Sequence, residues 1–264
     1  MMSTKHTLLR QSVAEFMGIA LFIFFGTGCV AALKLGGAQL GLWEISIIWG
    51  FGVALAIYLT AGVSGAHLNP AVTIALCFFS NFDVKKAPAY ILAQVAGAFF
   101  GASIVYVLYY NLFLDYEETN QIIRGSISSL DLTSIFSTYP NAKMALGQAF
   151  ATEFVITLIL MCLIFAIGDD NNGLPRGPLA PILVGILIAV IGGSMGPLTG
   201  FAMNPARDFG PKLFTYFAGY GGITFTGGKE IPYFLIPIVA PVLGALTGGI
   251  VYRYFISYSL PKKN

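Results

Sequence analysis

Two copies of the triad Asn-Pro-Ala are the groups in this chain that could act on a solute. One is Asn69-Pro70-Ala71, within GAHLNPAVT at 65–73, and the other is Asn204-Pro205-Ala206, within GFAMNPARD at 200–208. The asparagine amides can donate hydrogen bonds to a hydroxyl oxygen, while the backbone carbonyls before them can accept hydrogen bonds. The triads therefore predict reversible hydrogen bonding to a small polar molecule.

A second pair of motifs indicates that the triads belong to a duplicated unit. AEF at 14–16, which contains Glu15, recurs as TEF at 152–154, which contains Glu153. The interval from glutamate to asparagine is 54 residues in the first half and 51 in the second. Matching order and spacing are typical of an internal repeat. The two glutamates either bind a coupling proton or brace buried backbone amides, and we favour bracing.

The elements that must position these groups are membrane helices. Of the 264 residues, 56% are hydrophobic and only 10% are charged, whereas a soluble domain carries roughly 25% charged residues. Apolar stretches of about 20 residues can cross a hydrocarbon core about 30 Å thick. Six stretches are predicted to span the membrane, at 14–33, 49–63, 90–110, 149–167, 179–195 and 233–256.

Two further apolar stretches, 70–79 and 205–217, begin at the triads and are too short to span. About ten helical residues reach only about 15 Å, half of the hydrocarbon core. Asn69 and Asn204 suit the N-cap position, and a proline suits the first turn. The chain is predicted to be an all-α membrane protein with six transmembrane helices and two re-entrant half-helices, whose N-termini meet at mid-membrane.

The backbone ahead of each half-helix must be non-helical. At this depth such backbone is tolerated only where it is buried in protein or lines a water-filled cavity, and a pore is the simpler solution. One face of this pore should be polar and the opposite face apolar. The residues whose carbonyls are predicted to line it are Gly65, Ala66, His67 and Leu68, then Thr199, Gly200, Ala202 and Met203.

The organisation of the chain follows from the number of spans in each half. Because each half has an odd number, the second copy must enter the membrane from the opposite side. We predict a single domain over 1–264, with inverted repeats at about 8–110 and 145–258 joined by an external connector at 111–144. The connector is expected to be an ordered surface loop.

Charge indicates the orientation of the chain. The net charge of +2 is small and scattered, so nucleic-acid binding is not expected. With a cytoplasmic N-terminus, the positive charges on the cytoplasmic side are Lys5, Arg10, Lys85, Lys86, Arg176, Lys262 and Lys263, and Asp115, Glu117, Glu118 and Asp131 lie outside. Lys34, Arg124, Lys143 and Lys229 are exceptions. The positive-inside rule thus predicts a multi-pass protein of the cell (inner) membrane with both termini in the cytoplasm.

The phrases SGAHLNPAVT and GPLTGFAMNPARDFGP resemble the signature loops of the major intrinsic protein family. The longer phrase YLTAGVSGAHLNPAVTIAL and the phrase IPYFL resemble its glycerol-conducting branch, the aquaglyceroporins. This resemblance extends over nearly the whole chain. It implies passive diffusion of glycerol through the lipid bilayer, with urea, other polyols and water as further candidate solutes. It also implies a homotetramer in which every subunit holds its own pore.

The same resemblance implies that Trp49, Gly192, Phe201 and Arg207 form the narrowest region, near the external mouth. Two aromatic rings would give a hydrophobic corner for CH₂ groups, Arg207 would donate to hydroxyls, and Gly192 leaves room where water-selective members carry histidine. Asp208 resembles the residue that glycerol-conducting members carry after the second triad. Half-helix N-termini of about +0.5 charge each, together with Arg207, predict the exclusion of ions and protons.

Two other functions compete with this prediction. A water-selective channel of the same family would need a tighter constriction. A proton-coupled secondary transporter can also have inverted repeats with discontinuous helices, and Glu15 and Glu153 could titrate in it. An enzyme is the least expected class, because no Ser/His/Asp, Cys/His or metal-ligand constellation is visible. No cofactor and no metal site are expected.

Overall fold

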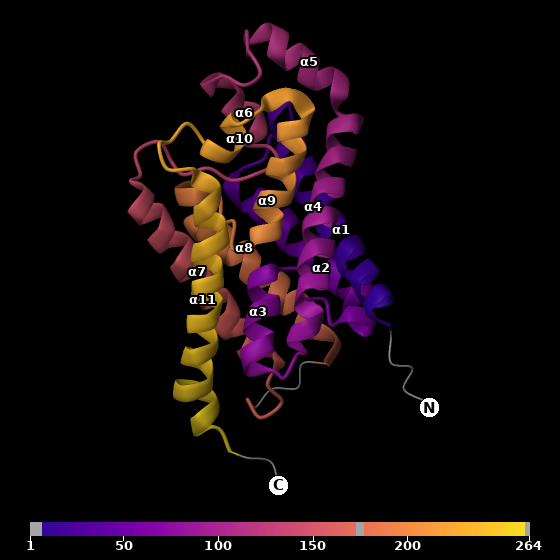
Figure 1. Ribbon diagram of the computed structural model, residues 1–264, viewed down its shortest axis with the longest axis vertical. Coiled ribbons are helices and arrows are strands. Elements are labelled where there is room, and N and C mark those ends of the chain that lie inside the picture. The colour runs from indigo at the N-terminus through magenta and orange to yellow at the C-terminus, as the bar shows by residue number, and fades with distance from the viewer. Residues whose placement is uncertain (1–6, 173–176, 262–264) are drawn as a thin grey trace.

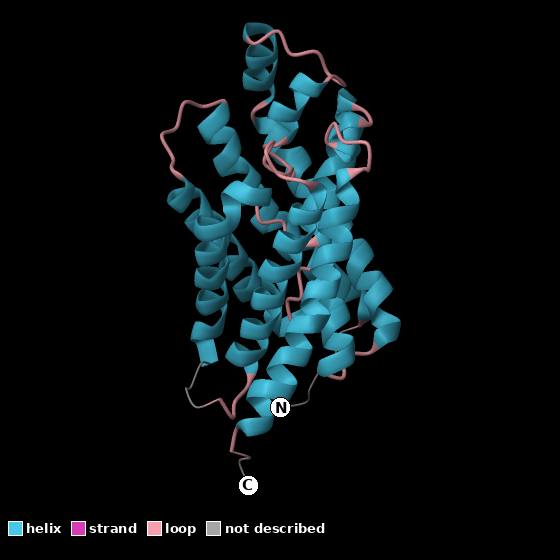
Figure 2. Ribbon diagram, turned by 90° about the vertical axis from the view of Figure 1, so that its left-hand side faces the viewer, coloured by secondary structure: helices cyan, strands magenta, loops and turns pink. Residues whose placement is uncertain are grey.

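Six apolar helices long enough to cross a membrane run along the long axis of the computed structural model, which describes residues 7–172 and 177–261 (Figure 1). The α-helical parts of these six spans are α1 (Leu8–Lys34), α2 (Leu42–Ser64), α4 (Ala87–Leu108), α7 (Leu146–Gly168), α8 (Ala180–Thr199) and α11 (Ile236–Val251). Helices and loops make up both described ranges, with no strand in either (Figure 2). The prediction of six apolar spans is confirmed.

Several of these helices are longer than the apolar stretches that predicted them. The first begins at Leu8 rather than at residue 14, because the Thr7 hydroxyl caps it by accepting from the Arg10 N–H at 3.4 Å. The second begins at Leu42 and carries the charged Glu44 in its first turn. Hydropathy locates the lipid-buried centre of a helix, whereas polar residues at the membrane surface continue the same backbone hydrogen bonding.

The two short segments are half-helices, α3 (Pro70–Phe79) and α9 (Pro205–Thr215). The first has the predicted bounds. The second was predicted to continue to 217 and ends earlier, because the chain passes into a π-helical turn at Tyr216–Tyr220. Gly219 in that turn has a φ of 97°, a conformation that ends helical geometry. In Figure 1, α9 lies above α3 in the middle of the bundle.

Asparagine caps start both half-helices, as predicted. The Asn69 side-chain oxygen accepts from the Ala71 N–H at 2.8 Å, and the Asn204 oxygen accepts from the Ala206 and Arg207 N–H groups at 3.0 and 3.2 Å. The proline that follows each asparagine occupies the first helical turn, where a missing N–H leaves no bond unmade.

Each half-helix packs on a long helix from the other half of the chain. The long helix α1 packs against α4 and α2, α8 packs against α2 and α7, and α7 also packs against α11. The half-helix α9 packs against α4, whereas α3 packs against α11. Loop segments run through the interior of the bundle (Figure 2). The crossed packing brings the two triads together at the centre.

The connector lies at the end of the molecule opposite the start of α1 and the end of the last helix (Figure 1). It was expected to be a surface loop, but it contains most of α5 (Tyr110–Thr119) and the short α6 (Leu130–Thr133). Another short helix, α10 (Ile223–Thr226), lies at the same end. These helices were missed because they are short and lack an apolar stretch of spanning length. Lys5, Arg176, Lys262 and Lys263, used in the orientation argument, lie outside the described residues.

Two positive residues that broke the charge pattern bind acidic residues of the connector. Lys34 forms an ion pair with Asp131, and Arg124 forms one with Glu117 at 2.7 Å. Partial burial by itself would raise the pKa of Asp131, but hydrogen bonds from Lys34 and Tyr116 outweigh it and hold that pKa below its ordinary value. These two exceptions to the positive-inside pattern are therefore neutralised locally, and the Lys34 pair also fastens the connector to α1.

Candidate functional site

The N-termini of the two half-helices meet and are joined by the triad asparagines. The Asn69 Nδ2 donates to the carbonyl oxygen of Met203 at 2.9 Å, and the Asn204 Nδ2 donates to the carbonyl oxygen of Leu68 at 2.8 Å. A carboxamide has two N–H groups, so each asparagine can hold the opposite loop with one and present the other to a solute. Both asparagines line the central cavity.

The loops ahead of the half-helices are strained in the same way in both halves. Ala66 and Leu68 have φ values of 51° and 52°, and Phe201 and Met203 have values of 42° and 51°. The left-handed region costs a non-glycine residue about 1–2 kcal/mol. Such strain persists only where the surroundings enforce it, and it concentrates at functional sites. All four residues line the cavity.

Glu15, which is completely buried, holds the first loop in its strained conformation. Its carboxylate accepts from the backbone N–H groups of His67 at 2.9 Å and Leu68 at 2.7 Å. It also accepts from the Gln94 side chain at 2.8 Å, and the same Gln94 nitrogen donates to the Thr73 hydroxyl at 3.0 Å. Since these amides have no partner in a ladder or helix, the carboxylate satisfies donors that would otherwise be buried without a bond.

Glu153 has the same relation to the second loop. Its carboxylate accepts from the N–H groups of Ala202 at 3.0 Å and Met203 at 2.8 Å, and from the Thr199 hydroxyl at 2.6 Å. The side chain is fully buried. The two glutamates thus hold matching loop positions, one and two residues before each triad asparagine.

One cavity of about 830 Å³ runs past the triads. The residues predicted to face the pore that line it are Trp49, Gly65, Ala66, His67, Leu68, Asn69, Phe201, Ala202, Met203, Asn204 and Arg207. The apolar side chains that also line it include Phe22, Val53, Ile57, Leu160, Ile164, Val184 and Ile188. The lining therefore combines polar groups of the loops with apolar side chains of the long helices.

Other predicted site residues lie outside the lining of this cavity. Gly200 ends α8 in the left-handed conformation with φ 77°, and Thr199 turns its hydroxyl to Glu153. Gly192 lies against the Phe201 ring. The triad residues Pro70, Ala71, Pro205 and Ala206 are buried in the first turns of the half-helices.

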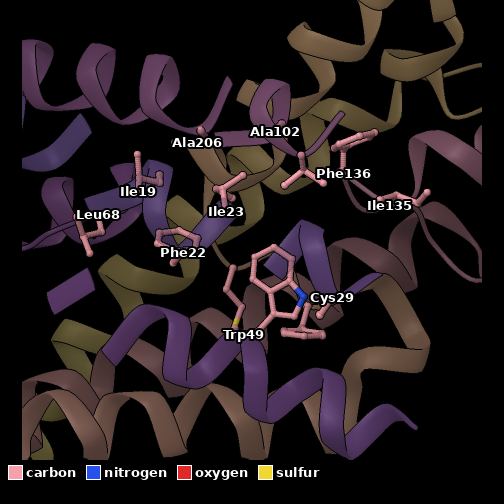
Figure 3. Close-up of a cluster of buried hydrophobic side chains, with 14 of the residues drawn as sticks. Ile19, Phe22, Ile23, Cys29, Trp49, Leu68, Ala102, Ile135, Phe136 and Ala206 are labelled. Carbon is pink, nitrogen blue, oxygen red and sulfur yellow. The ribbon is translucent and has the colours of Figure 1, made fainter. Parts of the chain in front are cut away.

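At one end of the cavity two aromatic rings and a guanidinium come together. The Trp49 and Phe201 rings meet edge to face with centroids 6.4 Å apart, and the Arg207 Cζ lies 4.1 Å from the Trp49 ring centroid. Figure 3 shows the Trp49 ring within the buried cluster that includes Phe22. A methyl group on Gly192 would lie 2.9 Å from the Phe201 ring. Because Gly192 has no side chain, the Phe201 ring can pack directly against it.

The guanidinium is held by the connector, which sequence reasoning did not predict. The Arg207 Nη1 donates to the carbonyl oxygen of Phe136 at 3.0 Å. The Phe136 side chain is buried in the same cluster as Trp49 (Figure 3). The cation–π contact with Trp49 and the hydrogen bond to the Phe136 carbonyl fix the direction of Arg207.

A buried ion pair holds the connector at Thr138, two residues after Phe136. Lys212 and Asp208 form a salt bridge of 2.6 Å with side chains 0% and 1% exposed. The Asp208 Oδ1 accepts from the Thr138 N–H and hydroxyl at 2.7 and 2.8 Å, while Lys212 donates to the Thr138 carbonyl at 2.8 Å. The pair thus binds both backbone groups of one residue and holds the segment that carries the Phe136 carbonyl.

Replacing Lys212 with methionine is expected to destabilise the protein by about 3–5 kcal/mol, because Asp208 would be left as a buried charge without its cation. The double replacement Asp208→Asn with Lys212→Met should cost clearly less than Lys212→Met alone. Resistance of the detergent-solubilised protein to chemical unfolding measures both. Equal losses for the single and double replacements would contradict a coupled pair.

Of the residues that sequence reasoning missed, two carried a signal. Lys212 follows Asp208 by one helical turn within a largely apolar stretch, and Gln94 is a polar residue inside a predicted span. Phe136 and Thr138 carried no signal in the sequence, since only the folded connector brings their carbonyls to the site. Among the residues that the structure describes, no group of three or more His, Cys, Asp or Glu side chains could hold a metal ion.

Comparison with known proteins places the chain among membrane channels. The family model described as "Major intrinsic protein" matches residues 2–252. The chain is 66% identical over 255 residues to a glycerol uptake facilitator protein of Pseudomonas aeruginosa, covering 97% of this chain and 91% of that one. It is 61% identical over 255 residues to a propanediol uptake facilitator of Citrobacter freundii, covering 97% and 95%.

A solved structure has the same fold. The aquaglyceroporin from Plasmodium falciparum superposes with a TM-score of 0.82 at 34% sequence identity, covering 95% of this chain and 97% of that one.

Proposed function

Because the chain belongs to the major intrinsic protein family, we infer that it is a passive membrane channel for glycerol and related small uncharged solutes. The observation that carries this function is the cavity that joins the Trp49, Phe201 and Arg207 cluster to both triad asparagines. The propanediol relative supports three-carbon diols as members of the same solute class.

A polyol can exchange its hydration for protein groups along this cavity. The second N–H of Asn69 and of Asn204 donates to a solute hydroxyl, and the loop carbonyls accept from it. The apolar wall, which includes Val53 and Ile188, packs against the carbon backbone of the solute. A solute that presents hydroxyls on one side and carbon on the other meets little barrier at any point.

Cations and protons meet two electrostatic barriers. Both half-helices direct their positive N-termini at the cavity centre, and Arg207 adds a full charge near one end. An anion would escape this repulsion but would lose its hydration shell between the Trp49 and Phe201 rings. Small neutral molecules are therefore the permeant class.

We assign the choice of glycerol over water alone to Trp49, Gly192, Phe201 and Arg207. Phe201→His combined with Gly192→His should lower glycerol permeability at least about tenfold and leave water permeability within about threefold, because narrowing excludes a CHOH group but still admits water. The single change Gly192→His is the matched variant, since it collides with the Phe201 ring. Stopped-flow light scattering of proteoliposomes measures both solutes. Unchanged glycerol rates in the double variant would show that these residues do not select the solute.

Vesicle swelling tests the function as a whole. Proteoliposomes placed in a glycerol gradient should shrink and then swell again at a rate that rises with the amount of protein. If they passed water rapidly without any glycerol-driven swelling, the channel would be water-selective and the function proposed here would be wrong. A panel of urea, erythritol and ribitol then ranks the other solutes.

Coupled transport is the competing mechanism, and the hydrogen bonds of Glu15 and Glu153 support bracing over proton binding. Each carboxylate already accepts from two backbone N–H groups. Protonation would remove acceptor capacity from donors that have no other partner. A facilitator brings glycerol to equal concentrations on both sides, whereas a coupled transporter accumulates it against a gradient.

The remaining assignments also belong to this proposal. The chain is one channel domain made of inverted repeats at about 8–110 and 145–258 with the external connector 111–144. It lies in the inner membrane with both termini in the cytoplasm, acts as a homotetramer with one pore per subunit, and has no catalytic activity. Cross-linking of the purified protein tests the tetramer, and a protease added to sealed, right-side-out spheroplasts should cut the connector but neither terminus.

A further inference from the structure

The end of the cavity away from Trp49 is also built from aromatic rings, and the proposed function does not yet use them. Phe79 from α3, Phe165 from α7 and Tyr252 from the last helix all line the cavity there. We propose that these three rings, the inner collar, form a second binding subsite for small polyols and take part in selecting among them. This proposal rests on the proposed function, since it adds a subsite to the same conduit.

The collar is a continuous aromatic surface assembled from three separate elements. The Phe79 and Phe165 rings meet edge to face with centroids 5.9 Å apart, and the Phe165 and Tyr252 rings stack 6.2 Å apart at 17°. Phe79 and Phe165 are only partly buried, so their exposed parts face the cavity they line. Stacked and edge-to-face rings hold one another in place, so this surface is preorganised.

Gly249 is what allows the rings to approach the last helix. A methyl group there would lie 2.5 Å from two atoms of the Phe79 ring and 3.2 Å from the Phe165 ring. Gly249 is itself buried and lines the cavity. At the outer end Gly192 similarly makes room for the Phe201 ring, so both ends of the conduit seat a ring against a glycine.

A carboxylate fixes the collar. The Tyr252 hydroxyl donates to the Asp169 Oδ2 at 2.9 Å, and the Ser257 hydroxyl donates to the same oxygen at 3.3 Å. The Asn171 N–H donates to the Asp169 Oδ1 at 2.8 Å. The last helix changes from α to π geometry at Tyr252, and such turns frequently occur at functional sites.

The inner collar and the outer cluster of Trp49, Phe201 and Arg207 differ in their charged neighbours, and this difference points to the solute class. The outer rings are accompanied by Arg207, which can only donate hydrogen bonds, whereas the inner end has both Asp169, which can only accept them, and Arg253, which can only donate them. Hydroxyl groups both donate and accept, and the C–H groups of a polyol pack on aromatic faces. Ser80 and Asn81 add further polar groups to the lining. A polyol therefore finds hydrogen-bonding groups beside an aromatic surface at both ends of the cavity.

Exchange of labelled glycerol at equal total concentration on both sides of proteoliposomes tests the collar. Phe165→Leu removes the ring and keeps an apolar side chain. We expect the glycerol concentration at half-saturation to rise about threefold to tenfold, the loss of one aromatic contact. Water permeability should stay unchanged, and Phe165→Tyr should restore the half-saturation value. Phe79→Leu, on a different element, should shift it in the same direction.

Phe16→Leu is the matched control, since Phe16 pairs with Phe100 at 5.6 Å and lies outside the cavity lining. Equal half-saturation values for Phe165→Leu, Phe79→Leu and Phe16→Leu, each with normal water permeability, would overturn the inner subsite and leave the channel function intact. If the unmodified protein did not exchange glycerol at all, the proposed function would fail first.

Discussion

Replacing Arg207 with alanine is expected to raise proton conductance at least about tenfold while glycerol still permeates. The guanidinium is 8% exposed and lies against the Trp49 ring and the Phe136 carbonyl. A unit charge acting over about 5 Å in a medium of effective dielectric constant 20 contributes about 3 kcal/mol to the barrier for a cation. The half-helix dipoles remain in the variant, so the barrier falls but does not vanish.

Collapse of a pH gradient across proteoliposomes measures the proton leak, with stopped-flow swelling on the same vesicles for glycerol. Arg207→Lys retains the charge and should leak much less than Arg207→Ala. Arg253→Ala removes a positive charge from the other end of the same cavity and serves as the control. Equal leak for Arg207→Ala and Arg253→Ala would show that the constriction charge does not form the barrier.

Replacing Glu153 with alanine is expected to lower the free energy of unfolding by about 3–5 kcal/mol and to abolish most glycerol flux. Two backbone N–H groups and the Thr199 hydroxyl would lose their acceptor in a fully buried place, and each such loss costs about 1–3 kcal/mol. The strained loop at Phe201 and Met203 would then relax, because it would lose the hydrogen bonds from Ala202 and Met203 that hold its conformation.

Unfolding of the purified protein in detergent and glycerol uptake by proteoliposomes measure these two losses. Glu44→Ala, at an exposed position in the first turn of α2, is the matched control and should be nearly neutral. Glu153→Gln should lie between them, since an amide keeps one acceptor oxygen. A fully stable Glu153→Gln protein that lost only accumulation against a gradient would favour proton coupling over bracing.

The regular elements of this protein were predictable from sequence because their causes are local. A run of apolar residues defines a span wherever it occurs, and an asparagine before a proline starts a helix through its own side chain. The spans and the bounds of α3 are confirmed. The errors lay at helix ends and in the connector, where polar residues extend a helix or form short ones without an apolar signal.

The contacts that shape the conduit came only from the tertiary structure, because they join atoms that are distant along the chain. The asparagine bonds to the opposite loops, the Phe136 carbonyl against Arg207 and the clamp of Asp208 and Lys212 on Thr138 are of this kind. Sequence by itself determined which segments lie in the membrane and where the half-helices begin. The fold decided which side chain each carbonyl meets, since a hydrogen bond depends on distances of a few tenths of an ångström that no local pattern specifies.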